Sequence, residues 1–279
     1  MNEIFTIGDF CFRLTCPDSV QIPENFLKFR GGADPQYCYT ITLADTFPAV
    51  EGQVVAQRPD LMVVRGSGGE CRYIGVKGDP RPYACYRETG TDAAQILLAA
   101  SRTEELSIDP VFASLFALER RQLALGALIL HCAFVEYQGE AILFSAPSET
   151  GKTTQANLWG RYRGAETVNG DRGMLQKLDG RWYARGWPVC GSSGVCENRD
   201  VPIRAIVMLS QAPADKAERL APMKAFTQLY SQITVNRWDR NAGLRAMELL
   251  EELISEIPVY HLACTMEPSA VEALEKTMN

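Results

Sequence analysis

A glycine, a lysine and three threonines lie together where an apolar segment runs into a segment of helical character. Residues 141–154 read AILFSAPSETGKTT, and the run from Ala146 to Thr153 has the spacing of a phosphate-binding loop in its Ala/Gly form. In such a loop several backbone N–H groups and the positive end of the following helix attract an anion. Lys152 adds a full positive charge, and the Thr153 hydroxyl can bind Mg²⁺. The spacing therefore predicts a polyphosphate site.

Glu149 is an unexpected residue in such a loop. A carboxylate that points inward repels phosphate, whereas one that points to solvent leaves the backbone N–H free to serve. We expect the second arrangement. The alternatives are a loop that does not bind nucleotide and a solvent-exposed helix start with Thr150 as its N-cap. We expect an exposed Lys152 side chain when no nucleotide is bound, so that Lys152→Ala removes activity with little loss of fold.

Asp171 is the candidate acidic partner of this loop, because a magnesium-phosphate site usually needs a carboxylate on a neighbouring strand. It follows a predicted strand at residues 166–169 and lies eighteen residues after Thr153. We expect it at the end of a strand beside the strand that leads into the loop. There it could hold Mg²⁺, directly or through water, or take a proton from an attacking hydroxyl. The other interpretation is a simple turn, since Asn169, Gly170 and Asp171 are all turn formers.

The chain has two histidines. His131 lies among apolar residues at the start of a predicted hairpin, whose second strand feeds the loop. It is therefore either a structural residue of the hairpin or a group that points toward the loop. His261, in the run VYHLAC, is expected to be a core or edge residue.

Alternating and periodic apolar patterns predict the elements that carry these residues. The N-terminal region has short strands joined by Gly-rich turns, which predicts a β-rich, mostly antiparallel domain. Beyond it, strands and helices alternate, which predicts an α/β domain with a mixed sheet covered by helices. The expected domains are 1–100 and 101–279. The predicted strands are 10–16, 37–43, 61–64, 71–76, 133–137, 141–145, 166–169, 174–178, 181–185, 203–210 and 258–263. The predicted helices are 92–101, 110–125, 152–163, 222–233, 241–256 and 268–278.

Composition narrows the class of protein. The 279 residues are 46% hydrophobic and 22% charged, with a net charge of −6, which argues against a general nucleic-acid or membrane-surface binder. Nine cysteines are scattered without a Cys-x-x-Cys pair, which favours buried, reduced thiols over a structural zinc site. The apolar runs are shorter than the roughly 20 residues that span a bilayer. These features predict a cytoplasmic protein.

The segment from His131 to Asn279 resembles the HPr kinase/phosphorylase and phosphoenolpyruvate-carboxykinase-like P-loop proteins, and most of all their short kinase-like relatives. The resemblance lies in a histidine that opens a hairpin, the run Ser-x-Pro-Ser-x-Thr-Gly-Lys-Thr-Thr at 145–154, an Asp-Arg pair at 171–172, the run Arg-Gly-Trp-Pro at 185–188, and the segment 198–209. It implies a P-loop core of mixed sheet and helices, and a kinase that depends on ATP and Mg²⁺. The implied acceptor is a Ser or Thr hydroxyl of a protein or peptide, and the implied assembly is a homo-oligomer.

The resemblance also implies roles for individual residues. Asp171 would hold the metal or act as the base, Lys152 and His131 would contact phosphate, and Thr153 would bind Mg²⁺. The residues expected to contact the nucleotide phosphates are Ser148, Glu149, Thr150, Gly151, Lys152, Thr153 and Thr154.

Three positions depart from the family pattern. Gly170 stands where HPr kinases have the first of two aspartates, and Glu149 stands where they usually have glycine. The segment before Arg185 reads Tyr183-Ala184, where they carry a glutamate that helps with metal. These departures keep two alternatives open, which are a nucleotide-binding regulatory module without phosphotransfer and an NTP hydrolase or phosphorylase.

Overall fold

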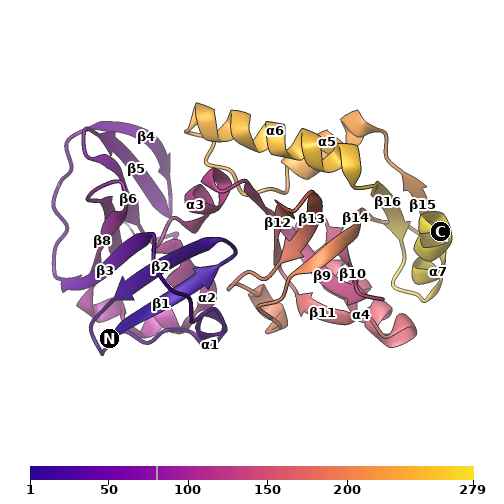
Figure 1. Ribbon diagram of the computed structural model, residues 1–279, viewed down its shortest axis with the longest axis horizontal. Helices are drawn as coiled ribbons and strands as arrows, with labels where there is room; N and C mark the ends of the chain where they lie inside the picture. The colour runs from indigo at the N-terminus through magenta and orange to yellow at the C-terminus, as the bar shows by residue number, and fades with distance from the viewer. Residues whose placement is uncertain (80) are drawn as a thin grey trace. The chain divides into compact units, whose positions relative to one another are not determined.

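The computed structural model describes residues 1–79 and 81–279, with only the backbone described at Glu104, Glu105 and Ser192. The chain divides into two compact units, Met1–Leu118 and Glu119–Asn279. Each unit has one sheet with both parallel and antiparallel strand pairs, together with helices (Figure 1). The fold class is therefore mixed α/β.

The N-terminal unit is built on an eight-stranded sheet in the order β1-β2-β3-β8-β7-β6-β5-β4. Strand β3 pairs in parallel with β2 and β8, and the other pairs are antiparallel. Its strands are β1 (Asn2–Ile7), β2 (Phe10–Thr15), β3 (Tyr37–Ala44), β4 (Gln53–Arg58), β5 (Leu61–Gly66), β6 (Gly69–Ile74), β7 (Ala84–Glu88) and β8 (Ala93–Ala99). Its helical segments are α1 (Glu24–Leu27), η1 (Ala100–Arg102), η2 (Glu104–Ser107) and α2 (Asp109–Ser114).

Two helix predictions near the end of this unit are wrong. Residues 92–101 contain strand β8 rather than a helix. Along β8 every second residue is buried, and the strand lies between β3 and β7 in the sheet. Alanine and leucine favour a helix in isolation, but pairing on both edges overrides that preference. The helix predicted at 110–125 is interrupted: α2 ends at Ser114, and α3 (Leu118–Ala124) begins directly after Ala117, which has a φ of 50°.

The C-terminal unit contains a closed circuit of five strands. β10 pairs with β9, β9 with β12, β12 with β13, β13 with β14, and β14 pairs in parallel with β10. The strands of this unit are β9 (Ala127–Tyr137), β10 (Glu140–Ser145), β11 (Glu166–Asn169), β12 (Arg172–Leu178), β13 (Arg181–Arg185), β14 (Val201–Gln211), β15 (Lys216–Arg219) and β16 (Val259–Cys264). Its other helices are α4 (Lys152–Arg163), η3 (Gly191–Ser193), α5 (Pro222–Tyr230), α6 (Arg240–Glu256) and α7 (Ser269–Met278).

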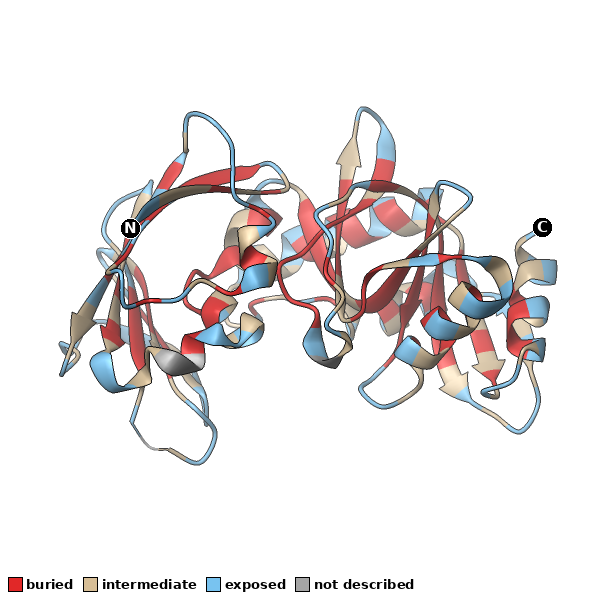
Figure 2. Cartoon of the chain, turned by 90° about the horizontal axis from the view of Figure 1, so that it is seen from below, coloured by how far each residue is buried: buried red, intermediate tan, exposed pale blue. Residues whose placement is uncertain are grey.

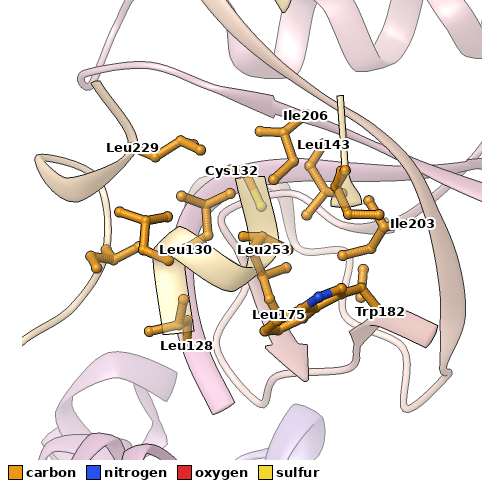
Figure 3. Close-up of a cluster of buried hydrophobic side chains, with 14 of the residues drawn as sticks. Leu128, Leu130, Cys132, Leu143, Leu175, Trp182, Ile203, Ile206, Leu229 and Leu253 are labelled. Atoms are coloured by element: carbon orange, nitrogen blue, oxygen red, sulfur yellow. The ribbon is translucent and has the colours of Figure 1, made fainter. Parts of the chain in front are cut away.

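Two hydrophobic clusters lie on opposite faces of β10, because its side chains alternate. Leu143 belongs to a cluster that includes residues of α5 and α6. The labelled side chains of this cluster point toward one another in Figure 3. Phe144 belongs to the cluster that includes Trp159 of α4 and Leu274 of α7. Burial on both faces accounts for the continuous apolar run that precedes the loop. Figure 2 shows that many residues of the strands are buried.

The hairpin before the loop is confirmed, but its first strand is longer than predicted. Gln138 and Gly139 both have positive φ (55° and 78°), as a tight two-residue hairpin turn requires. β9 begins at Ala127, so His131 lies inside the strand and not at its start.

Two further features bear on the class of protein. In the part of the chain that the structure describes, no helix is both long enough and apolar enough to cross a bilayer. All nine cysteines lie within the described residues, and none of them forms a disulfide bond there. Eight of them are buried as expected, whereas Cys38 is exposed because it lies on the outward side of β3.

Candidate functional site

The loop at residues 146–151 joins β10 directly to the first turn of α4. Gly151 is the N-cap of α4, with a φ of 116° that favours glycine, and no side chain caps the helix. The alternative in which Thr150 is the N-cap is therefore wrong. A helix start without a side-chain cap keeps its first N–H groups and its positive dipole end available to an anion. The side chain of Thr153, in this first turn, is exposed.

The side chain of Lys152 lies across the loop and is buried. Only 7% of the residue is exposed, and its Nζ donates to the carbonyl oxygens of Ala146 (3.1 Å) and Pro147 (3.3 Å). The expectation of an exposed lysine is wrong, because the carbonyls of the loop hold the ammonium group. Burial lowers the pKa of Lys152, and the nearby charge of Asp171 opposes this.

Glu149 has an exposed side chain, the arrangement expected for a residue that contributes only its backbone. Its φ is 64°, a left-handed conformation that costs a non-glycine residue about 1–2 kcal/mol. Its carbonyl oxygen accepts a hydrogen bond from Nε2 of Gln211, at the end of β14 (3.3 Å). The conformation explains why glycine suits this position.

The structure brings His131 and Asp171 together. Nε2 of His131 lies 3.4 Å from Oδ1 of Asp171, and Nε of Arg172 lies 3.2 Å from the other carboxylate oxygen. The hydrogen bond from His131 lowers the pKa of Asp171, and the charges of Arg172 and Lys152 act in the same direction against burial. The carboxylate is therefore ionised at neutral pH.

The sequence predicts that the strand leading to Asp171 lies beside the strand leading into the loop. This prediction is wrong. β11 pairs with β9, which pairs with β10 on its other edge. Asp171 nevertheless reaches the site, because its carbonyl oxygen accepts a hydrogen bond from the backbone N–H of Cys132, next to His131 (3.0 Å). The backbone of His131 is itself held, since its carbonyl accepts from the hydroxyl of Ser145, the last residue of β10 (2.8 Å).

Asn169, a residue that sequence patterns identify only as a turn former, positions the Asp171 segment. Its side chain is fully buried. Oδ1 accepts hydrogen bonds from the backbone N–H groups of Asp171 and Arg172 (both 2.9 Å), and Nδ2 donates to the carbonyls of Trp187 (2.9 Å) and Val189 (3.1 Å). The turn at Asn169, Gly170 and Asp171 is therefore present, and its asparagine positions the candidate acid.

Two of the departures from the family pattern have a structural counterpart. A Cβ placed on Gly170 would lie 2.1 Å from Oγ of Ser193, so a residue with a side chain does not fit there unless Ser193 moves. Ala184 is completely buried inside the hydrophobic cluster of the strand circuit. Neither position supplies a second carboxylate to the site.

The donors at the site are of the type that Mg²⁺ prefers, since Thr153 offers a hydroxyl and Asp171 a carboxylate. Among the side chains that the structure describes, no group of three or more His, Cys, Asp or Glu is arranged to hold a metal ion. The second histidine, His261, lies on β16, where its Nε2 is 2.9 Å from Oγ of Ser210.

Comparison with known proteins identifies a family. Residues 97–279 match the model of a family described as SynChlorMet cassette protein ScmC. Among solved structures, the Hpr(Ser) kinase/phosphatase from Coxiella burnetii is similar at 10% identity and a TM-score of 0.32, over 53% of this chain and 93% of that one. No curated protein matches the chain. Because the family match spans more than half of its residues, the chain belongs to the SynChlorMet cassette protein ScmC family.

Proposed function

We propose that this protein is a kinase that uses ATP and Mg²⁺ to transfer the terminal phosphate to a Ser or Thr hydroxyl of a protein or peptide. One observation carries the proposal. The Asp171 carboxylate contacts His131 and Arg172, and its pKa also responds to Lys152 beside the uncapped start of α4. The Asp171 carboxylate, with its partners His131 and Arg172, is thus linked electrostatically to the lysine at a helix start that attracts anions.

The loop and Lys152 would hold the phosphates. The first-turn N–H groups of α4 face the anion, and Lys152 exchanges the carbonyl oxygens of Ala146 and Pro147 for phosphate oxygens. The exchange costs little, because each carbonyl can then bond to water or to the loop itself. Catalysis would come mainly from positioning and from neutralising the charge of the phosphates.

Thr153 and Asp171 would hold Mg²⁺, which neutralises phosphate charge when bound. The low pKa of Asp171 keeps it ionised, which suits a cation ligand and makes it a weak proton acceptor. In the transfer, the acceptor oxygen forms a bond to the terminal phosphorus while the bond to the leaving ADP oxygen breaks. The hydroxyl proton passes to Asp171 or to solvent as the new phosphate ester forms.

A nucleotide-binding regulatory module without phosphotransfer is the second candidate. The close packing of Gly170 against Ser193 supports it, because an additional carboxylate has no room at that position. In this case nucleotide affinity survives Asp171→Ala, and neither form transfers phosphate.

The test combines binding and transfer. The purified chain is titrated with Mg-ATP by calorimetry and then incubated with Ser- and Thr-containing peptides, with mass spectrometry to detect the addition of one phosphate. We expect binding and transfer for wild type, neither for Lys152→Met, and unchanged behaviour for Lys216→Met, which removes an exposed lysine. ATP binding without transfer to any peptide supports the regulatory module. The absence of any binding at millimolar Mg-ATP rejects both candidates.

A further inference from the structure

Three parallel neighbouring strands end at the edge of the sheet that carries the 146–151 loop. β10 pairs in parallel with β14, and β14 pairs in parallel with β16 (Figure 1). The segments that follow them are 146–151, 212–215 and 265–268. The carboxyl ends of such strands are where open α/β sheets bind ligands. β9, which carries His131, lies on the other side of β10.

These three segments are tied to one another and to α4. Nε2 of Gln211 donates to the carbonyl of Glu149 (3.3 Å). Nε2 of the fully buried Gln155, in the first turn of α4, donates to the carbonyl of Thr265 (3.2 Å). The loop after β16 is therefore fixed to the helix whose start forms the proposed phosphate site.

Asp215 fixes the loop after β14 to the loop after β16. Its carboxylate accepts hydrogen bonds from the backbone N–H (2.6 Å) and the hydroxyl (3.1 Å) of Thr265, and from the hydroxyl of Ser269 (2.5 Å). The hydrogen bonds lower the pKa of Asp215 against the effect of burial. Three hydrogen bonds to one ionised carboxylate hold the loop after β14 against the loop after β16.

The pinned loops leave apolar side chains in solvent. Met266 follows Thr265 directly and is 76% exposed. Pro213, in the loop after β14, and Pro147, in the loop after β10, are also exposed. Each of the three neighbouring loops thus presents at least one exposed apolar residue at the same edge of the sheet.

We propose that Met266 and Pro213 form the subsite for the base of the bound nucleoside triphosphate. The inference rests on the proposed function, because the phosphates must lie at the start of α4. With Asp171 and His131 on the β9 side of β10, the terminal phosphate points to that side and the nucleoside to the β14 and β16 side. Neighbouring strands are about 4.8 Å apart, so β16 lies about 10 Å from β10. The base lies beyond the ribose at this end of the nucleotide, where a thioether packs favourably on an aromatic ring.

The test compares two ligands that share their phosphates and differ in the base. Mg-ATP and magnesium tripolyphosphate are titrated by calorimetry into wild type, Met266→Gln, Met266→Leu and Met223→Gln. Met223 is the matched control, since it is also 76% exposed but lies on α5. We expect Met266→Gln to weaken ATP binding about threefold to tenfold and to leave tripolyphosphate binding unchanged. Met266→Leu and Met223→Gln should bind both ligands as wild type does.

Two results overturn the subsite while the proposed function stands. One is equal ATP affinity in wild type and Met266→Gln, and the other is an equal loss of ATP and tripolyphosphate affinity in Met266→Gln. A wild-type chain that binds neither ligand overturns the proposed function, and the subsite with it.

Discussion

Nε2 of His131 lies 3.4 Å from Oδ1 of Asp171, although the two residues are separated along the chain by the hairpin turn, the 146–151 loop and α4. The contact forms because β12, which starts next to Asp171, pairs with the first half of β9. Arg172 is the direct partner of His131 in that pair. A histidine and an aspartate that lie far apart along the chain therefore share one site.

Asp171 should make stability depend on pH. Its pKa is lower in the folded chain than the ordinary value of 3.8, so its contribution is fully present above the unfolded pKa and is lost as pH falls through the folded pKa. We expect the difference in free energy of unfolding between wild type and Asp171→Asn to be constant from about pH 5 to 7 and to shrink below about pH 4. Denaturant titrations across this range measure it, with Asp179→Asn, at an exposed turn, as the control. A difference that stays constant down to pH 2 would contradict the prediction.

Glu149→Gly should raise both stability and phosphate affinity. Glycine removes the cost of a φ of 64°, about 1 kcal/mol, and it also removes a negative charge beside the anion site. Glu149→Ala separates the two effects, because it removes the charge but keeps a side chain at the unfavourable φ. We expect both variants to bind tripolyphosphate more tightly than wild type, and only the glycine variant to melt at a higher temperature. The prediction fails if alanine raises the melting temperature as much as glycine.

Asn169→Ala should destabilise the C-terminal unit. The substitution removes four hydrogen bonds to backbone groups and leaves buried groups without partners, for a loss of about 2–4 kcal/mol. Thermal unfolding measures this loss. Asn241→Ala, at an exposed position of α6, should cost less than about 0.5 kcal/mol. Equal effects of the two substitutions would remove the positioning role of Asn169.

Gly170 and Ser193 should be energetically coupled. Gly170→Ala places a Cβ 2.1 Å from Oγ of Ser193 and should cost about 1–3 kcal/mol. Ser193→Gly removes the hydrogen bond from that hydroxyl to the carbonyl of Cys190 (2.7 Å) and should cost about 1 kcal/mol. We expect the double variant to be at least about 1 kcal/mol more stable than the sum of the single effects. Additive effects in the double-mutant cycle would show that the contact is not limiting.

Local sequence signals account for much of the C-terminal unit. The bounds of α4, β11 and β13 are those predicted, because capping glycines, turn residues and apolar periodicity act within a few neighbours along the chain. The order of strand, loop, Gly151, Lys152 and helix is therefore predictable from the sequence without any tertiary contact.

Only the tertiary structure decided which of these residues meet and how. Strand β8 forms because its two edges pair with segments distant in sequence, and this overrides the helix preference of its residues. Lys152 is buried because the loop folds its carbonyls over the ammonium group, and Asp171 reaches His131 through β9 rather than through β10. Strand pairing and burial depend on contacts between distant segments. Residue types and spacing therefore identified the candidate chemical groups, and the closed circuit of strands placed them together.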